Sequence, residues 1–359
     1  MLNGNFWRKR RVLITGHTGF KGSWLCLWLS LLGAETAGYA LKPPTNPSLF
    51  ELCEIDSIIK STIGDIADLE KLKKTLIVFK PEIVIHMAAQ SLVRESYIDP
   101  GNTYHTNVIG TVNLFEAARV CRNIKVIINV TTDKCYENDE RKKPFQESEP
   151  LGGCDPYSNS KACSELVTNA YRFSFFNPDK YKKHKVAVAS VRAGNVIGGG
   201  DWAKDRLIPD FVRAVLSGDK IYIRNPKAIR PWQHVFEPLS GYLLLAERLY
   251  KYGPEYGQAW NFGPNFREAR NVEWVIKRLC SKWGKGATYQ ISKGKHPHEA
   301  TCLRLNCIKA QKKLGWYPKW DLETGLDKII EWTKAYQKKY DLKQLNYFQI
   351  KEFMSARKK

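Results

Sequence analysis

Residues 11–22 read RVLITGHTGFKG, from Arg11 to Gly22, and place three glycines directly after a short apolar run. The run has the length and composition of a buried strand, and the apolar segment WLCLWLSLL at residues 24–32 predicts a helix after the turn. In a loop spaced GxxGxxG, the first glycine permits a tight strand-to-helix turn and the second lets the backbone approach a pyrophosphate. The third lets the helix pack closely on the strand. The stretch therefore predicts a dinucleotide-binding fold.

The acidic residue that usually follows the second strand of such a fold is missing. The sequence there is GYALK at residues 38–42, and Lys42 is either a contact for a 2′-phosphate or an exposed surface lysine. The sequence therefore leaves both NAD+ and NADP+ open. Asp65, after the third predicted strand, has the position to accept the adenine amino group, although Asp65 and Asp68 could instead cap the next helix.

Apolar strands alternate with helical patterns through the first half of the chain. ETAGYAL, EIVIHMAA and KVIINVTT have the character of strands, and helical patterns cover DLEKLKKTLIVF and the segment from about Asn107 to Arg119. A further helical stretch runs from Pro156 through Tyr171 and precedes the strand KVAVASVRAGNVIG. This alternation predicts an α/β fold with a Rossmann-type doubly wound parallel sheet.

The second half of the chain has a different texture. After Gly198, short strands alternate with Pro- and Gly-rich segments such as GGGDWA and RNPKAIRPW, which predicts a smaller mixed α/β C-terminal lobe that binds the substrate. We expect the dinucleotide-binding Rossmann domain at residues 1–194, with a return at about 232–262. The substrate lobe is expected at 195–231 and 263–350, followed by a basic tail at 351–359.

Composition favours a folded enzyme of a reducing compartment. Nine cysteines occur singly, without a CxxC pair, which argues against a zinc site and against a disulfide framework. No apolar run reaches the roughly 18 residues of a membrane span, so we expect a cytoplasmic protein without a metal or membrane partner. The formal charge of +21 would suit nucleic acid, but the basic residues form many short, separate clusters. A solvated surface that steers an anionic substrate is the preferred interpretation.

Two segments place reactive side chains where the sheet would present them. VTTDKCYEN, residues 130–138, ends an apolar strand with a hydroxyl, a carboxylate and an amine, and strand ends are where α/β sheets bind ligands. DPYSNSKA opens a helix with Tyr157 and Lys161 four residues apart, on one face. A nearby ammonium would lower the pKa of Tyr157 and make it a base near neutral pH. The alternative for VTTDKCYEN is a solvated turn, and the alternative for DPYSNSKA is a chance spacing of Tyr and Lys.

The order and spacing of these motifs resemble the nucleotide-sugar 4,6-dehydratases of the extended short-chain dehydrogenase/reductase family. The resemblance extends from about Trp7 to about Trp332 and is most specific in GHTGFKGSWL, HMAAQSLVRESYIDP, TTDKCYEN, DPYSNSKA, RAGNVIGGGDWAKDRLIPD and IRNPKAIRPWQHVFEPLSGYLLL. It implies a tightly bound NAD+. The residues implied to contact this cofactor are Gly16, Thr18, Gly19, Phe20, Gly22, Asp65, Ile66, Ala88, Ala89, Gln90, Tyr157 and Lys161.

The resemblance also implies catalytic roles. In this family the tyrosine is the base on a substrate hydroxyl, the lysine holds the nicotinamide ribose, and a Ser or Thr on the preceding strand hydrogen-bonds the same hydroxyl. These roles fall to Tyr157, Lys161 and Thr132. Members that act on dTDP-glucose carry an Asp-Glu pair after that strand, whereas members that act on CDP-glucose carry Asp-Lys, as in Asp133-Lys134. CDP-glucose is therefore the implied substrate.

Dehydration across C5 and C6 of a hexose explains why such a pair is needed. Oxidation of C4 to a ketone acidifies the C5 proton, and NADH later returns its hydride to C6. A base must then remove the C5 proton, and an acid must protonate the departing C6 hydroxyl. We assign Lys134 as the base and Asp133 as the acid. Lys134 must then have a lowered pKa and Asp133 a raised one, unless the pair is an ordinary surface turn.

The remaining expectations concern the substrate, the assembly and the alternatives. In related enzymes the nucleotide sugar is gripped at positions that correspond to Gln90, Asn195, Arg206, Leu207, Arg224, Asn225, Arg230 and His298. We expect structural roles for His86 and Glu165.

The resemblance implies a homodimer or homotetramer that assembles through helix bundles. It also implies a product that feeds deoxysugar and surface polysaccharide biosynthesis, including the O-antigen of lipopolysaccharide. A nucleotide-sugar 4-epimerase or reductase, and a non-catalytic dinucleotide-binding regulator or nucleic-acid binder, are the alternatives.

Overall fold

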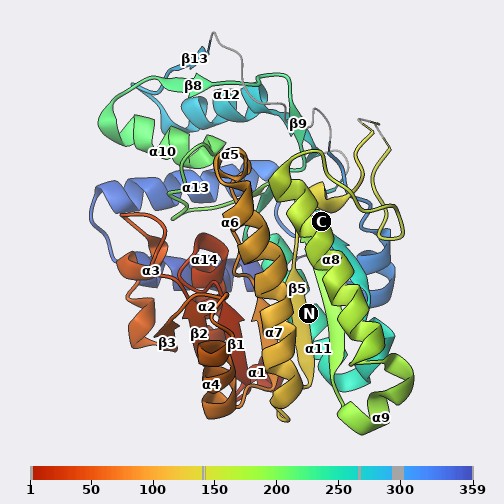
Figure 1. The fold of residues 1–359 in the computed structure, drawn as a ribbon. Coiled ribbons are helices and arrows are strands. Elements are labelled where there is room, and N and C mark those ends of the chain that lie inside the picture. Colours follow the sequence, from red (N-terminus) through yellow and green to blue (C-terminus); the bar gives the residue numbers. More distant parts are fainter. Residues whose placement is uncertain (1–2, 140, 142, 266–267, 293–302, 358–359) are drawn as a thin grey trace.

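The computed structural model describes residues 3–139, 141, 143–265, 268–292 and 303–357. Its centre is a seven-stranded parallel sheet with the strand order β11-β6-β5-β4-β1-β2-β3 (Figure 1). The strands are β1 (Arg11–Thr15), β2 (Glu35–Ala40), β3 (Lys60–Ile63), β4 (Ile83–His86), β5 (Val126–Val130), β6 (Ala187–Ala193) and β11 (Ala259–Phe262). The order reverses between β1 and β4, which is where such sheets bind ligands. The predicted Rossmann-type doubly wound sheet is confirmed.

Helices cover both faces of this sheet, and the side chains of β1 show how. Val12 and Ile14 belong to the core under α2 and α11, whereas Leu13 belongs to the core under α4 and α7, because successive strand residues point to opposite faces. Trp24 and Trp28 are fully buried and pack edge-to-face on Phe236, with ring centroids 4.9 and 5.6 Å apart. The covering helices are α2 (Phe20–Leu31), α4 (Leu69–Phe79), α7 (Gly110–Val120), α8 (Pro156–Ser174) and α11 (Phe236–Tyr252).

The helix predicted from about Asn107 begins earlier in the structure. Asp99 accepts a hydrogen bond from the backbone N–H of Asn102 at 2.9 Å, and Pro100 occupies the first helical position. A continuous helical run therefore comprises α6 (Pro100–Tyr104), a π-helical segment (His105–Ile109) and α7. The sequence interpretation missed this capped start and the preceding α5 (Val93–Ile98).

Short strand pairs and helices form a smaller lobe, which lies above the sheet in Figure 1. The pairs are β7 (Val196–Ile197) with β10 (Gln233–His234), β8 (Ile221–Ile223) with β13 (Tyr289–Ile291), and β9 (Ile229–Arg230) with β12 (Arg270–Asn271). The lobe helices are α10 (Leu207–Ser217) and α12 (Val272–Trp283). The remaining short elements are α1 (Gly4–Trp7), α3 (Leu49–Leu52), η1 (Ile55–Ser57), η3 (Asp133–Cys135), η4 (Pro178–Lys180), α9 (Tyr181–His184), η5 (Gly253–Tyr256) and η7 (Ala310–Leu314).

The C-terminal helices α13 (Leu322–Gln337) and α14 (Leu342–Ser355) lie partly outside the expected lobe. α14 packs on α2, where the rings of Phe353 and Trp28 meet edge-to-face at 5.6 Å. It therefore extends the layer that covers the sheet, and it includes residues 351–355 of the expected basic tail. The domain boundaries drawn from the sequence stay a prediction.

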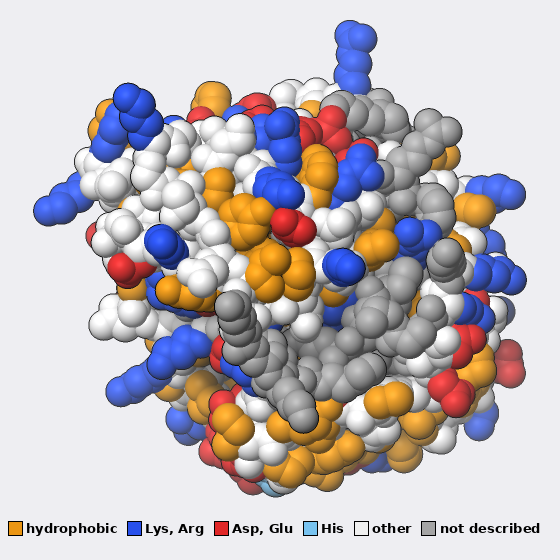
Figure 2. Space-filling view, turned by 90° about the horizontal axis from the view of Figure 1, so that it is seen from above, with side chains coloured by type: hydrophobic (Ala, Val, Ile, Leu, Met, Phe, Trp, Pro, Cys, Tyr) orange, Lys and Arg blue, Asp and Glu red, His pale blue; other side chains and the backbone are white. Residues whose placement is uncertain are grey.

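The charged surface, the apolar helices and the cysteines of the described chain bear on the partners expected from the sequence. Lysine and arginine side chains are dispersed over the face seen from above, rather than gathered in one stripe (Figure 2). In the part of the chain that the structure describes, no helix combines the length and apolarity of a bilayer span. Within the same residues, no cluster of three or more His, Cys, Asp and Glu side chains could hold a metal ion, and the cysteines are free thiols.

Candidate active site

The glycine loop between β1 and α2 is packed too tightly for a side chain at its first and third glycines. Gly16 has a φ of +76°, and a Cβ there would lie 2.7 Å from the backbone nitrogen of Ala88. A Cβ on Gly22 would lie 2.2 Å from the carbonyl oxygen of Gly16. The first glycine thus makes the turn beside β4, and the third lets the first turn of α2 touch the loop. Together they bring a helix N-terminus to the sheet's reversal point, which suits a pyrophosphate.

A cavity of about 900 Å³ opens over this loop. Its wall includes every residue that the sequence assigned to the cofactor. These residues are Gly16, Thr18, Gly19, Phe20, Gly22, Asp65, Ile66, Ala88, Ala89, Gln90, Tyr157 and Lys161. The cavity thus joins the glycine loop to the start of α8, and its size and glycine-lined wall fit a dinucleotide.

The structure distinguishes the two alternatives for the acidic residues after β3, which are an adenine contact and a helix cap. Asp68 caps α4 by accepting a hydrogen bond from the backbone N–H of Lys71 at 3.0 Å. Asp65 instead lines the cavity, with one carboxylate oxygen held by the Ala67 N–H at 2.9 Å. Asp65 therefore remains available to an adenine, whereas Asp68 is a capping residue. Lys42 also lines the cavity, so its role toward a 2′-phosphate stays open.

The end of β5 buries an acid beside a hydroxyl. The hydroxyl of Thr132 donates to Asp133 Oδ1 at 3.1 Å and accepts the backbone N–H of Lys134 at 3.4 Å. Asp133 is only 2% exposed, and its Oδ2 has no hydrogen-bond partner among the described residues. Gly194 leaves room for this oxygen, because a Cβ there would lie 2.1 Å away. Burial raises the pKa of Asp133, against the opposing charge of Lys134, as an acid catalyst requires.

Lys134 itself is half-buried, and its charge is one of those that act on Asp133. It is therefore neither the fully buried lysine that the base role favours nor an ordinary exposed one. The pair is not the solvated turn that was the alternative for this segment, because Asp133 lies in the core.

Tyr157 and Lys161 lie one turn apart at the start of α8. Asp155 caps this helix by accepting the Ser158 N–H at 2.9 Å, and the backbone N–H of Tyr157 donates to the Ser96 hydroxyl at 3.1 Å. The Lys161 ammonium donates to the carbonyl oxygen of Val130, the last residue of β5, at 3.2 Å. The start of the helix and the strand end at Val130 and Thr131 therefore line the same cavity. Thr132, Asp133 and Lys134 are not part of its wall among the described residues.

The expected lowering of the tyrosine pKa is not found in this structure. Burial raises the pKa of Tyr157 to about 12, while the Thr132 hydroxyl and the Arg206 charge act in the opposite direction. Burial and the nearby Lys21 lower the pKa of Lys161 to about 8. The four-residue spacing of Tyr157 and Lys161 carries no information on the cost of ionising a phenol in the core.

Lys21 is a cavity residue that the sequence analysis missed. It lies in the first turn of α2, where its charge interacts with Asp133, Asp201 and Arg206, and burial lowers its pKa to about 8. The signal was present in GHTGFKG, because a lysine in the apolar first turn after a glycine loop must point its amine somewhere polar. Here that direction is the cavity.

The residues expected to grip the nucleotide sugar fall into three groups. Gln90 and Arg206 line the cavity, and Arg206 donates to the Ser91 hydroxyl at 3.0 Å and to Asp201 at 3.3 Å. Arg230 is buried close enough to act on the pKa of Asp133, and Arg224 forms an ion pair of 2.7 Å with Asp205 on the cavity wall.

The third group does not meet the cavity. Asn195, Leu207 and Asn225 are absent from its wall among the described residues, and His298 lies outside the described residues. The carbonyl oxygen of Asn195 instead accepts a hydrogen bond from the Gln233 N–H at 3.2 Å. The roles of these four residues stay predictions.

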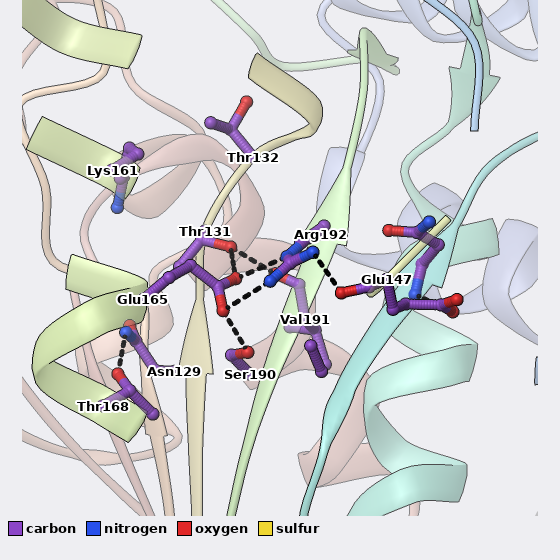
Figure 3. Close-up of polar contacts among 12 residues, drawn as sticks. Asn129, Thr131, Thr132, Glu147, Lys161, Glu165, Thr168, Ser190, Val191 and Arg192 are labelled. Carbon is purple, nitrogen blue, oxygen red and sulfur yellow. Dashed lines mark hydrogen bonds and ion pairs between the residues drawn. The ribbon is translucent and has the colours of Figure 1, made fainter. Parts of the chain in front are cut away.

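His86 and Glu165, which were expected to be structural, are buried in polar networks. His86 Nδ1 lies 2.7 Å from the Thr15 hydroxyl, and burial lowers the pKa of His86 to about 3, so the ring is neutral. Glu165 forms a buried ion pair with Arg192 (Figure 3).

Comparison with known proteins places this geometry among nucleotide-sugar enzymes. A family model described as GDP-mannose 4,6 dehydratase matches residues 13–329. The CDP-glucose 4,6-dehydratase of Salmonella typhimurium is 53% identical over 356 residues, which is 99% of each chain. The dTDP-glucose 4,6-dehydratase of Bacillus anthracis, solved with NAD, has a TM-score of 0.74 at 23% identity, covering 93% of this chain and 99% of that one. The UDP-glucose 4-epimerase of Thermotoga maritima, solved with UDP-glucose, has a TM-score of 0.77 at 22% identity, covering 91% and 99%.

Proposed function

The chain belongs to the family described as GDP-mannose 4,6 dehydratase, within the extended short-chain dehydrogenases, and from that premise we propose that it is a redox-neutral CDP-glucose 4,6-dehydratase. It converts CDP-D-glucose to CDP-4-keto-6-deoxy-D-glucose. The observation that supports this proposal most strongly is Asp133, which is buried, has a raised pKa and lies next to Lys134. Both residues follow the strand end that Lys161 contacts from the helix of Tyr157. A 4-epimerase or reductase would use the tyrosine and lysine but needs no proton donor for a leaving hydroxyl.

NAD+ is the cofactor that the cavity fits. The glycine loop would hold its pyrophosphate at the N-terminus of α2, and Asp65 would receive the adenine amino group. When bound, NAD+ accepts the C4 hydride and later returns it to C6. The Bacillus anthracis dehydratase that shares this fold was solved with NAD, which supports the same choice here.

Three residues serve the oxidation of C4. Tyr157 takes the proton of the C4 hydroxyl, and Thr132 hydrogen-bonds the same oxygen. Lys161, held by the Val130 carbonyl oxygen at 3.2 Å, binds the nicotinamide ribose. Since burial raises the pKa of Tyr157 to about 12, the tyrosine needs positive charge nearby in order to act as a base. The ammonium of Lys161 and the nicotinamide ring supply that charge.

Two residues serve the elimination of water. Lys134 takes the C5 proton once the C4 ketone has acidified it, and Asp133 gives its proton to the C6 hydroxyl, which leaves as water. Lys134 then returns a proton to C5 when C6 has received the hydride. Burial already holds Asp133 toward its protonated form, so this acid is prepared before the substrate arrives.

Arginines hold the far end of the substrate. We assign the diphosphate to Arg206, which lines the cavity, and to Arg230, whose charge acts on Asp133. Arg224 is proposed for the nucleotide end together with Asn225, and Asn195, Leu207 and His298 complete the proposed set. Fixing the nucleotide orients the distant hexose for the chemistry at C4 to C6.

A substrate panel tests the proposal. The purified chain with NAD+ is incubated separately with CDP-, dTDP-, UDP- and GDP-linked hexoses, and products are identified by mass and NMR. The expected result is loss of one water from CDP-glucose, with a 4-keto-6-deoxy product and no net NADH. A C4 epimer or a net redox change would contradict the dehydratase assignment, and preference for another nucleotide would contradict the base specificity.

We also propose a homodimer or homotetramer. The supporting observation is a set of exposed apolar side chains on α5, α7 and α8 and the loops beside them, which a second copy of the chain would cover: Tyr97, Ile98, Ile109, Val120, Leu166, Phe173 and Phe175. Light scattering of the purified chain measures the mass of the assembly. The proposed product feeds deoxysugar and surface polysaccharide biosynthesis, including O-antigen, in the cytoplasm.

A further inference from the structure

Glu165 occupies the third position of a row that begins with two proposed catalytic residues. Tyr157, Lys161 and Glu165 follow each other at four-residue spacing in α8, so they share one face of that helix. Glu165 is 4% exposed, and its side chain points to the end of β5 and to β6 (Figure 3). A buried carboxylate in this row is costly unless its oxygens are fully satisfied.

Every contact of this carboxylate reaches a neighbouring strand. Oε1 accepts from the Thr131 hydroxyl at 2.6 Å, and Oε2 accepts from the Ser190 hydroxyl at 2.5 Å. Arg192 donates two parallel hydrogen bonds, from Nε to Oε1 at 2.9 Å and from Nη2 to Oε2 at 3.0 Å. The guanidinium is itself held by the Glu147 carbonyl oxygen at 3.2 Å. The geometry is the bidentate one that gives an ion pair directional strength.

These contacts join the two halves of the active site. Thr131 is the chain neighbour of Thr132 and Asp133, whereas Glu165 shares its helix with Tyr157 and Lys161. We propose that Glu165, braced by Arg192, is a positioning residue that fixes the catalytic helix against the catalytic strand end. The inference rests on the proposed function for the identity of the reaction, but not for the contacts.

The charge of Glu165 also acts on Lys161, one turn earlier in the same helix. Burial opposes ionisation of Glu165, but Arg192 and the two hydroxyls hold the pKa of Glu165 below its ordinary value, so the carboxylate stays charged. That charge raises the pKa of Lys161, against burial and Lys21, which lower it to about 8. The titratable or charged groups that face these two residues are Lys21, His86, Cys135, Arg172 and Arg192, besides Tyr157 in the same helix.

The test compares Glu165→Gln with a matched control. Thr168→Val, one turn further along α8, removes the hydroxyl that accepts the Asn129 amide at 2.7 Å and so loosens the same helix without changing any charge. A second variant, Glu165→Gln with Arg192→Met, removes the uncompensated guanidinium and is used if the single variant does not fold. Four quantities are measured: kcat for CDP-glucose, KM for CDP-glucose, the pH dependence of kcat, and the pKa of Lys161 by NMR of ¹³C-lysine-labelled protein.

The expected result is a loss of catalytic rate without a comparable loss of substrate binding. For Glu165→Gln, kcat falls by about a hundredfold, as displaced catalytic groups cause, while KM stays within about twofold because the nucleotide is held elsewhere. The alkaline limb that follows Lys161 moves to lower pH by about one unit, the shift expected for loss of a charge several ångströms away. Thr168→Val keeps the wild-type pH profile and Lys161 pKa.

Two results would overturn the inference. One is a folded Glu165 variant with the wild-type kcat and Lys161 pKa, and the other is a loss that Thr168→Val reproduces in full. The proposed function fails separately, if the wild-type chain does not turn over CDP-glucose at all. The pKa of Lys161 measured by NMR still tests the inference in that case, because this pKa does not depend on which substrate is used.

Discussion

Asp133 and Lys134 are adjacent in the chain but lie in different environments. Asp133 is in the core, where one of its carboxylate oxygens has no hydrogen-bond partner in the described part of the chain, whereas Lys134 is half-buried. A buried carboxyl favours its neutral form, so the fold alone favours the protonated state that the proposed acid role of Asp133 needs. A half-buried lysine that acts as a base needs nearby positive charge, such as Lys161 or an oxidised nicotinamide ring, to favour its neutral form. The base is therefore the residue whose assignment most needs a direct test.

Lys134→Met separates oxidation from elimination. The methionine keeps most of the side-chain volume but cannot accept a proton, so the C5 proton should not be removed, whereas Tyr157, Thr132 and Lys161 can still oxidise C4. We expect NADH absorbance to appear on mixing with CDP-glucose, while product formation falls by about a hundredfold or more. Exchange of the C5 hydrogen with deuterium from solvent, followed by NMR, should stop.

Lys204→Met is the matched control for this variant. Lys204 is exposed at the rim of the same cavity, so its loss should leave both NADH formation and C5 exchange near the wild-type rates. If C5 exchange continues at the wild-type rate in the Lys134 variant, another group is the base and the assignment is wrong.

The glycine loop and α2 act as one element. The loop has no space for a Cβ at Gly22, because the helix touches the carbonyl oxygen of Gly16 there. This contact brings the N-terminus of α2 close to the cavity floor. A single methyl group at this point should therefore act on the whole element rather than on one side chain.

Gly22→Ala should weaken cofactor binding. The new methyl group would lie 2.2 Å from the Gly16 oxygen, so the loop or the helix must move, at a cost of about 1–3 kcal/mol in stability. We expect the Kd for NAD+, measured by calorimetry, to rise by tenfold or more. Gly4→Ala in α1 is the control, since nothing lies within 4 Å of a Cβ there. Equal NAD+ affinity of the two variants would show that the tight contact does not shape the site.

At the same scale, the sequence predicted one element whose cause is local, missed another local signal, and had no access to features whose cause is tertiary. GxxGxxG after a strand predicted the β1-loop-α2 unit, because the glycines themselves make the turn. The start of the helical run at Pro100 was missed, although Asp99 and Pro100 carry a capping signal. The raised pKa of Tyr157 and the cavity position of Lys21 depend on how α8, β5 and α2 meet. No spacing within one segment contains that information.

At the scale of the whole molecule, one buried carboxyl links the C-terminal segment to the sheet domain. Glu237, in the first turn of α11, is 1% exposed and accepts the backbone N–H groups of Lys319, at 3.0 Å, and Trp320, at 2.7 Å. The Lys319 ammonium is turned away, to the carbonyl oxygens of Phe353 and Met354. The two N–H donors favour the carboxylate, but burial prevails and raises the pKa of Glu237 to about 8.

Stability should consequently fall as pH rises, and Glu237→Gln should reduce this fall. A folded-state pKa of about 8, above the ordinary 4.5, means that the stabilisation is complete below about pH 4.5 and is lost as pH rises through about 8. Between about pH 4.5 and 8, this group lowers the free energy of unfolding by about 1.4 kcal/mol per pH unit.

Glutamine at position 237 keeps the shape of the side chain and does not titrate. The Tm of the variant, measured from pH 5 to 9, should therefore vary less than that of the wild type, and the variant should be the more stable protein at pH 9. Glu255→Gln, at an exposed carboxylate, should reproduce the wild-type slope. Parallel Tm curves for wild type and Glu237→Gln would mean that the donors of Lys319 and Trp320 outweigh burial and that Glu237 is ionised in the fold.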